Sequence, residues 1–263
     1  MVSPKLLLLA LSQTAWTWDA PSHEGYELVW QENFVGEGGS MPNPDNWNII
    51  TDINVNNELQ KYTTSNRNLQ NSGGSTFQIV PWRDGDGWTS GRLESTYTFT
   101  PEPGRLTAAE GQIRFGNNDV ADKRGYWPAF WLLGDSIGSG TEWPTCGEVD
   151  IFEAVNGELT GHGTLHCDAC NEPVGVGSSI DIPDQGWHTW RVEWDRRADD
   201  WTGESLSWYR DGEKFHEVTG ASLGDEGSWA AVAHSPLFFI LNVAVGGNLV
   251  SPRASRCFSR RVR

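Results

Sequence analysis

Three carboxylates lie within six residues in the segment Gly147–Glu153, whose other side chains are apolar and typical of a β-strand. Side chains alternate between the faces of a strand, so Glu148 and Asp150 share one face while Glu153 would point to the other. A β-bulge at Ile151-Phe152 would absorb one extra residue and bring the three acids together. Two carboxyl groups about 5–5.5 Å apart are what a retaining glycosidase uses, as nucleophile and as acid/base. The alternative is a solvated acidic edge strand in which the acids do not converge.

An aromatic segment leads toward this acidic strand. Residues 126–134 read YWPAFWLLG, and Trp143 precedes Glu148 by five residues. The closeness in sequence predicts a hairpin, and a flat indole suits stacking on the apolar face of a sugar ring. We therefore assign Trp131 and Trp143 to a substrate cleft. Core packing is the interpretation we favour for Trp127, Phe130, Leu132 and Leu133.

The segment 161–166, GHGTLH, is predicted to be the strand that returns beside the acids. His162 and His166 are four residues apart and share one strand face. We select His166 as the residue that would hydrogen-bond Asp150 or a sugar hydroxyl. The alternative is a structural histidine with its hydrogen bonds satisfied elsewhere.

The rest of the chain favours an all-β fold. Residues 26–34 predict a first strand, residues 187–194 alternate over eight positions, and residues 236–245 form the most apolar run. Asp211-Gly212 between two such runs is a strong hairpin signal. No window shows a sustained helical period, so we expect a two-layer sandwich without long helices.

Composition excludes several classes of partner. The formal net charge of -16 and the pI near 4.7 disfavour nucleic acid and anionic membranes. The 15 Trp and 30 Gly fit many short strands joined by turns, with some indoles serving as working surfaces. We expect a soluble monomer that uses no cofactor.

The two ends of the chain differ from its middle. Residues 1–19 have one Lys, an apolar run and then small residues, which predicts a secretory signal peptide and an extracellular product. Residues 253–263 carry five Arg and no acid, and we interpret them as an atypical tail. A single catalytic domain is expected over residues 20–252.

The cysteines are more consistent with a disulfide than with a metal. There is one C-x-x-C pair but no second pair for zinc, and no βαβ pattern for a redox motif. One disulfide is expected in a secreted chain, and its connectivity cannot be deduced from sequence. The four candidates are Cys146, Cys167, Cys170 and Cys257.

The run GEVDIFE, preceded by WPAFWLLG, resembles glycoside hydrolase family 16. The pieces that follow the same order as in that family are NNELQKY, SGRLES, EGQIRF, GHGTLH, GWHTWRVEWD, WYRDG and FFILNVAVGGN. The resemblance covers residues 26–248 and looks closest to fungal secreted endo-1,3(4)-β-glucanases of the laminarinase kind. It implies a concanavalin A-like jelly-roll β-sandwich of two antiparallel sheets with a concave substrate cleft, and a role in carbohydrate metabolism at the fungal cell wall.

The resemblance also implies roles for individual residues. It makes Glu148 the nucleophile, Glu153 the general acid and then base, and Asp150 the partner that orients and tunes the nucleophile. One carboxyl pKa should rise in such a group, and a raised pKa suits the acid. The resemblance further implies that four residues line the substrate-binding subsites: Arg92, Trp131, Trp143 and His166. For Arg92 a structural salt bridge to a neighbouring acid is the alternative.

Spacing and departures refine this expectation. Relatives that act as lichenases or xyloglucan transglycosylases have one residue fewer between the second and third acids, so this chain resembles the laminarinase branch. Enzymes for sulfated galactans also occur there, but the acidic charge favours neutral β-glucan. We expect that the Arg-rich tail replaces the family's last strand, which would expose a sheet edge. It also removes an acid often used for a structural calcium, so we predict no metal.

Several other functions remain open on sequence alone. A transglycosylase of the same fold would transfer the glycosyl group to another glucan instead of water. A non-catalytic glucan-binding module or an inactive truncated product are further alternatives, although both Glu148 and Glu153 are present. The expected activity is retaining endo-hydrolysis of β-1,3-glucan or mixed 1,3/1,4-glucan through a covalent glycosyl-enzyme.

Overall fold

The computed structural model describes residues 19–171 and 174–250. Two predicted segments lie outside the described residues: residues 1–18 of the expected signal peptide and the Arg-rich tail at 253–263. The expected replacement of the last strand by this tail therefore stays a prediction. Within the described chain, no helix combines the length and apolar character needed to cross a membrane.

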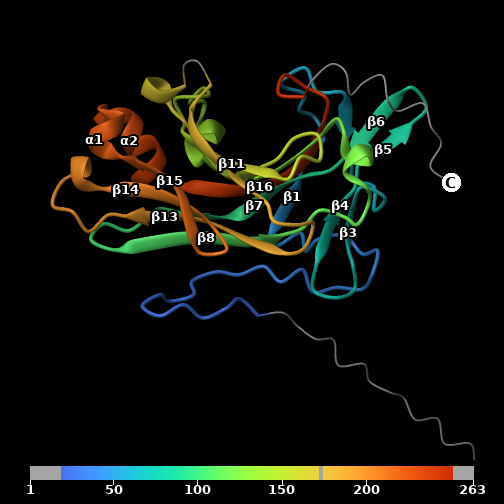
Figure 1. The fold of residues 1–263 in the computed structure, drawn as a ribbon, viewed down its shortest axis with the longest axis horizontal. Helices are drawn as coiled ribbons and strands as arrows, with labels where there is room; N and C mark the ends of the chain where they lie inside the picture. Colours follow the sequence, from blue (N-terminus) through green and yellow to red (C-terminus); the bar gives the residue numbers. More distant parts are fainter. Residues whose placement is uncertain (1–18, 172–173, 251–263) are drawn as a thin grey trace, which may run out of the picture.

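Two antiparallel sheets stack face to face (Figure 1). The larger sheet contains, in spatial order, β1 (Trp47–Ile49), β7 (Arg92–Phe99), β16 (Leu237–Val245), β9 (Tyr126–Gly134), β10 (Glu148–Glu153), β11 (Thr160–His166) and β12 (Val176–Asp181). The smaller sheet contains β15 (Glu213–Thr219), β14 (Ser205–Arg210), β13 (His188–Asp195) and β8 (Leu106–Ile113). This is the predicted all-β sandwich.

Shorter elements lie at the two ends of the sandwich (Figure 1). One end carries the small sheets formed by β2 (Gln60–Tyr62), β6 (Gly87–Ser90) and β5 (Trp82–Asp84), and by β3 (Leu69–Asn71) and β4 (Phe77–Ile79). The other end carries α1 (Gly220–Leu223) and α2 (Glu226–Ala233). The remaining 3₁₀ turns are Val120–Lys123, Asp135–Ser139, Asp168–Cys170 and Trp201–Gly203. In the described residues α2 is the longest helix, which agrees with the missing helical period.

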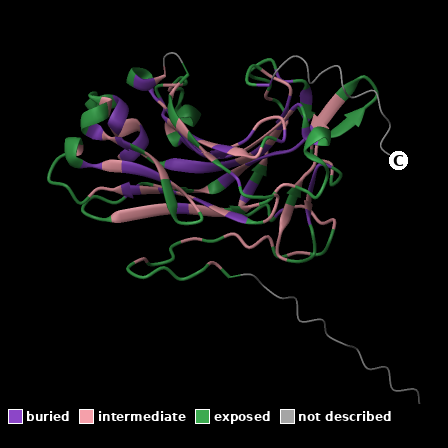
Figure 2. Ribbon diagram, viewed as in Figure 1, coloured by how far each residue is buried: buried purple, intermediate pink, exposed green. Residues whose placement is uncertain are grey.

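The core lies between the two large sheets, where Figure 2 shows the buried stretches of their strands. Strand β13 alternates as predicted, with His188, Trp190, Val192 and Trp194 buried. Trp190 packs on Phe152 of the larger sheet with 4.5 Å between ring centroids. Four large indoles of the main core cluster are only 0–1% exposed and explain part of the Trp content: they are Trp190, Trp194, Trp208 and, on α2, Trp229.

The hairpin predicted at Asp211-Gly212 joins β14 to β15. Both residues have positive φ, 50° and 83° respectively. A two-residue turn of this kind matches the twist of the flanking strands, and aspartate and glycine tolerate the left-handed conformation.

The prediction of a strand at residues 26–34 is wrong, because the structure has no strand there. The segment is anchored by side chains instead: Trp30 stacks on Tyr97 at 5.0 Å and on Phe239 at 5.4 Å between ring centroids. A strand needs a backbone partner as well as an apolar pattern. Stacking of the aromatic residues holds the segment without that pairing.

Candidate active site

The bulge predicted in the acidic strand is confirmed. Along β10, Glu148 lies opposite His166 of β11, and Asp150 lies opposite Trp131 of β9. Between Asp150 and Glu153 the register shifts on both sides, so the strand contains an extra residue relative to its neighbours. The three acids therefore share the face of the larger sheet that is turned away from the smaller sheet, which we call the outer face.

The core stabilises this bulge. Ile151 and Phe152 are both buried, at 0% and 1% exposure, so the two consecutive side chains at the irregularity pack into the interior. The indole of Trp208, from the smaller sheet, donates a 2.8 Å hydrogen bond to the backbone carbonyl of Asp150. Because a bulge interrupts the regular ladder, this bond supplies a partner to a buried carbonyl beside it.

Glu148 lies between an indole and an imidazole. The Nε1 of Trp143 donates to Oε2 of Glu148 at 3.1 Å, and Nε2 of His166 lies 3.9 Å from Oε1. Burial raises the pKa of Glu148 well above its ordinary value, and the charges of Asp150 and Glu153 act in the same direction. His166 and the Trp143 hydrogen bond oppose that shift by favouring the ionised form.

Asp150 is the most deeply buried of the three acids. Its side chain is 4% exposed, and its Oδ2 has no hydrogen-bond partner within the described residues. The nearest nitrogen is Nε2 of His166 at 3.4 Å. Burial raises the pKa of Asp150 well above its usual range, and the charge of Glu153 raises it further. A proton on Asp150 would relieve this repulsion.

Glu153 receives a hydrogen bond of 2.6 Å from Nε1 of Trp127 to its Oε1. Burial raises the pKa of Glu153, while the Trp127 bond and the charge of His166 lower it. The raised pKa expected for the acid is therefore present. It is not confined to Glu153, because all three carboxyl groups lose solvation on the same strand.

Trp127 is a site residue, and its assignment to the core is wrong. Strict alternation along β9 would have revealed it, because Trp127 has the same parity as Trp131 on the outer face. Phe130 and Leu132 are buried in the main core as predicted, at 6% and 0% exposure. Leu133 is also buried but belongs to a smaller apolar cluster with Cys146, Phe238 and Ile240, against which Trp131 packs.

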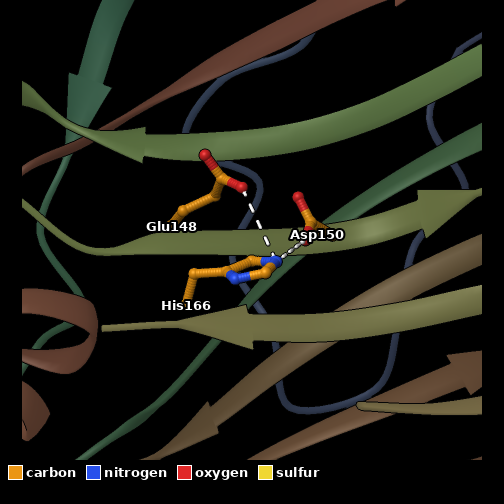
Figure 3. Close-up of side chains that lie close together, drawn as sticks. All are labelled: Glu148, Asp150 and His166. Carbon is orange, nitrogen blue, oxygen red and sulfur yellow. Dashed lines mark ion pairs between the residues drawn. The ribbon is translucent and has the colours of Figure 1, made fainter. Parts of the chain in front are cut away.

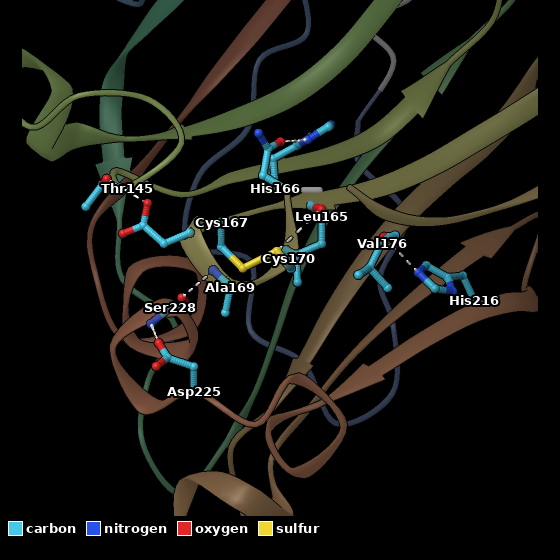
Figure 4. Close-up of a disulfide and its surroundings, with 12 residues drawn as sticks. Thr145, Leu165, His166, Cys167, Ala169, Cys170, Val176, His216, Asp225 and Ser228 are labelled. Carbon is cyan, nitrogen blue, oxygen red and sulfur yellow. Dashed lines mark hydrogen bonds between the residues drawn. A yellow bond between two sulfur atoms is a disulfide. The ribbon is translucent and has the colours of Figure 1, made fainter. Parts of the chain in front are cut away.

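His166 is oriented by a residue that the sequence did not suggest. Its Nδ1 lies 2.9 Å from Oδ1 of Asn171, and Figure 3 shows its ring directed at Glu148 and Asp150. Asn171 follows the Asp168–Cys170 turn, which Figure 4 shows closed by the disulfide Cys167–Cys170. The expectation of one disulfide is confirmed; Cys146 is free and buried, and Cys257 lies outside the described residues.

Trp143 and Trp131 occupy different surroundings. Trp143 is 48% exposed and its ring centroid lies 5.7 Å from that of His166, so much of the indole is accessible beside Glu148. Trp131 is partly buried, and its Nε1 donates to Oδ1 of Asn242 at 2.8 Å. The structure thus brings both predicted tryptophans to the outer face near the acids.

Arg92 forms the salt bridge that was its alternative interpretation. Its Nη2 lies 2.7 Å from Oε1 of Glu94, and its guanidinium carbon lies 4.9 Å from the centre of the Trp131 ring. The side chain is buried. Arg92 therefore braces Trp131 from within the protein, and its contact with substrate stays a prediction.

A second layer of polar residues supports Trp131. Asn242 donates through Nδ2 to the hydroxyl of Tyr62 at 3.2 Å, and that hydroxyl donates to Oε2 of Glu58 at 3.3 Å. Burial raises the pKa of Tyr62, so the phenol stays neutral and can donate. Spacing in the sequence could not have revealed this network, because its residues lie far apart along the chain.

Glu148, Asp150 and His166 are also arranged as a group of possible metal ligands. One ligand atom from each lies within 4.8 Å of the other two. In the described part of the chain this is the group of acids and histidine that comes close enough to share an ion. The absence of a metal was predicted on other grounds and stays a prediction.

Known proteins are similar to this chain in both sequence and fold. Residues 114–184, which include the acidic strand, match the model of the XgeA-like catalytic domain of glycoside hydrolase family 16. A beta-glucanase of Rhodothermus marinus is 31% identical over 84% of this chain and 76% of its own length. The crystal structure of an endo-1,3-beta-glucanase from Streptomyces sioyaensis superposes with a TM-score of 0.81, at 34% identity, over 88% of this chain and 89% of that one.

A third relative has been solved with a sugar bound. It is a mutant of SCLam, a non-specific endo-beta-1,3(4)-glucanase from the same family, with 1,3-beta-D-cellobiosyl-glucose at its active site. It is 25% identical, with a TM-score of 0.69 over 89% of this chain and 91% of that one. The sequence match to the Rhodothermus enzyme and these superpositions agree with the predicted jelly-roll fold and with the predicted enzyme class. This chain is a glycoside hydrolase that belongs to the endo-1,3-β-glucanase, or laminarinase, group of family 16.

Proposed function

We propose that the protein cleaves neutral β-1,3-glucan, or mixed 1,3/1,4-glucan, within the chain and with retention of anomeric configuration. The observation that carries this proposal is the bulge in β10, which places Glu153 on the outer face with Glu148 and Asp150. Retaining hydrolysis needs two carboxyl groups on one site, and a third one beside them can tune the pair.

Glu148 is the nucleophile in this proposal. Trp143 donates to one of its oxygens and His166 faces the other, so both neighbours favour the ionised form. An ionised carboxylate attacks the anomeric carbon and forms a covalent glycosyl-enzyme. The bond to the leaving oxygen breaks as that oxygen receives a proton from Glu153.

Glu153 acts first as acid and then as base. Burial holds its pKa above the usual range, which favours the protonated form that the first step needs. The negative charges of Glu148 and Glu153 repel each other. Once Glu148 is esterified its charge is gone, so the pKa of Glu153 falls and its carboxylate can take a proton from the incoming water. Water then releases the sugar and restores Glu148.

Asp150 orients the nucleophile and shares the excess proton. It lies between the two glutamates on β10, and its Oδ2 has no hydrogen-bond donor in the described structure. A proton held on Asp150 in the resting enzyme leaves Glu148 ionised at a lower electrostatic cost than three neighbouring charges would impose. This arrangement fits the tuning role implied by the family resemblance.

The substrate is held, in this proposal, by Trp131 and Trp143 through stacking and by His166 through a hydrogen bond to a sugar hydroxyl. Arg92 contributes by fixing the Trp131 ring and is the weakest candidate for direct contact. The outer face gathers acids near the reacting centre, and the whole chain has a formal charge of -16. A neutral glucan avoids the repulsion that sulfated or uronic polysaccharides would meet there.

Rescue of a nucleophile variant tests the mechanism directly. Glu148→Ala should lose turnover by several orders of magnitude and regain it in the presence of azide, with a glycosyl azide of inverted configuration as the product. The anomeric configuration is measured by proton NMR. Rescue of Glu153→Ala with the same inverted product, and none for Glu148→Ala, would exchange the two roles and refute the assignment.

Linkage preference and cellular setting complete the proposal. Laminarin and lichenan should release reducing sugar while xyloglucan should not, since the Streptomyces enzyme and SCLam are named for 1,3 and 1,3(4) linkages. The sequence alone supports four further parts of the proposal: secretion by way of residues 1–19, a monomeric state, a fungal source and action on fungal cell wall glucan. Amino-terminal sequencing of the product from culture medium checks the first of these.

A further inference from the structure

Glu148 and His166 each have one polar side-chain atom hydrogen-bonded and a second one facing Asp150, whose buried Oδ2 has no hydrogen-bond partner in the described residues. Nδ1 of His166 lies 2.9 Å from the carboxamide oxygen of Asn171, which can only accept a hydrogen bond. When the imidazole is neutral, its proton is therefore on Nδ1. The lone pair of Nε2 faces the acids on β10 (Figure 3).

The two acids present matching atoms. Oε2 of Glu148 accepts from Trp143, while Oε1 lies 3.9 Å from Nε2 of His166. Oδ2 of Asp150 lies 3.4 Å from the same nitrogen, is buried, and has no hydrogen-bond partner in the described residues. When Asp150 has released its proton and the imidazole is neutral, three electron-pair donors face one point, and a cation can take the place of that proton.

The spacing fits a small tetrahedral ion. Zinc binds imidazole nitrogen at about 2.0–2.1 Å and carboxylate oxygen at about 2.0–2.2 Å, so two tetrahedral ligands lie roughly 3.3–3.5 Å apart. The 3.4 Å between His166 and Asp150 already has this value, whereas the three ligand atoms together are spread over as much as 4.8 Å, so the Glu148 side chain must move inward to bind the ion. Calcium and magnesium prefer oxygen-only shells, so the imidazole selects against them.

The hydrogen bonds around these atoms resemble those of metal sites in general. A metal-bound histidine usually donates its other ring N–H to an oxygen, which fixes the ring and the tautomer. Asn171 supplies that oxygen, and its position after the disulfide-closed Asp168–Cys170 turn holds it beside the end of β11. The metal would enter from the outer face, where the fourth ligand would be water.

We propose that Glu148, Asp150 and His166 bind one Zn²⁺ ion, and that this ion inhibits the enzyme. The binding itself does not rest on the proposed function. The inhibition rests on the proposed function, because zinc would occupy the oxygen of Glu148 that attacks the sugar. Zinc and glucan therefore compete for one site, and the ion is an inhibitor rather than a cofactor.

Calorimetric titration of the metal-free full chain with zinc chloride tests the binding. The wild-type protein should bind one equivalent, and His166→Ala should abolish this binding or weaken it by more than about 100-fold. Asn171→Ala keeps all three ligands and should weaken it by about 10–100-fold, the usual effect of losing a residue that orients a ligand. His162→Ala is the matched control, on the same strand and face but opposite Glu153, and should bind like the wild type.

No heat of binding in the wild type, or equal affinity in wild type and His166→Ala, would refute the site. Thermal melts of each variant show that lost binding is not lost folding, and Asn171→Ala provides the test if His166→Ala does not fold. Zinc should raise KM for laminarin with little change in kcat; a lowered kcat at constant KM would place the ion elsewhere. Zinc binding without any laminarin hydrolysis by the metal-free enzyme would refute the proposed function and leave the metal site standing.

Discussion

The outer face has two halves that treat polar groups in opposite ways. In the acidic half, formed by Glu148, Asp150, Glu153 and His166, carboxyl groups lie beside one another and one buried oxygen has no hydrogen-bond partner among the described residues. The braced half is formed by Arg92, Trp131, Asn242 and Tyr62: Arg92 lies over the Trp131 ring, Trp131 donates a hydrogen bond to Asn242, and Asn242 donates one to Tyr62.

This difference assigns the reactive groups to the acidic half and the rigid ones to the braced half. The acidic half carries electrostatic strain, which raises carboxyl pKa values and can be discharged when a substrate arrives. The braced half has its hydrogen bonds made before substrate binds, so its indole costs little entropy to order. Changes in the acidic half should alter turnover, whereas changes in the braced half should alter KM.

The largest expected effect follows removal of the acid. Glu153→Gln keeps the shape of the side chain but cannot transfer a proton, so kcat should fall by about 10²–10⁴-fold on laminarin. Glu94→Gln is the control, because Glu94 is a paired carboxylate beside the braced half. Equal losses of kcat in the two variants would remove the distinction between the halves.

Asp150→Asn should reduce turnover by about 10²-fold through misplacement of the nucleophile, and yet stabilise the fold. The folded-state pKa of Asp150 is raised, so the folded protein binds more protons than the unfolded one above the ordinary aspartate pKa. Wild-type stability therefore falls as pH rises through that interval, and the variant avoids the loss. The gain should be absent at acid pH and grow toward neutrality, by about 1.4 kcal/mol for each unit of pKa displacement.

Denaturant titrations at several pH values measure this gain. Asp195→Asn is the control of opposite sign, because the hydrogen bond from Arg197 lowers the pKa of Asp195. Its stabilising contribution exists above the ordinary aspartate pKa, so the variant should lose stability there. A destabilised Asp150→Asn at neutral pH would show that the aspartate is not under electrostatic strain.

Trp127→Phe should lower kcat by about 10–100-fold, the effect of removing a hydrogen bond to a charged group. The Trp127 bond favours the ionised form of Glu153, so its loss raises the pKa of Glu153 further. The alkaline limb of the pH profile of kcat/KM should move to higher pH. Trp131→Phe loses an indole bond to Asn242 instead, and should raise KM without moving that limb.

The smallest effect is expected in the braced half. Tyr62→Phe removes a hydroxyl that links Asn242 to Glu58, which costs about 1 kcal/mol and should raise KM for laminarin several-fold at nearly constant kcat. Tyr97→Phe is the control, because Tyr97 stacks on Trp30 away from the site. A fall in kcat larger than the rise in KM would contradict the proposed division.

Local patterns were enough to predict the acidic half but not its support. The alternation of β10 and the extra residue before Glu153 indicated the bulge. The dipeptide Asp211-Gly212 indicated the hairpin between β14 and β15. The strand expected at residues 26–34 failed because apolar periodicity says nothing about a backbone partner. Asn171 and Asn242 escaped notice because their neighbours are set by a turn and by sheet order, and not by spacing in sequence.

The bulge has a consequence for insertions and deletions in the catalytic strand. Deletion of Ile151 would restore plain alternation, and the third glutamate would still emerge on the outer face two positions after Asp150. The strand can therefore exist in two lengths with the same acidic face, and the difference falls on the interior, which would lose one fully buried side chain. A change of one residue in strand length at this point would leave the three acids on the outer face and would reduce only the packing between the two sheets.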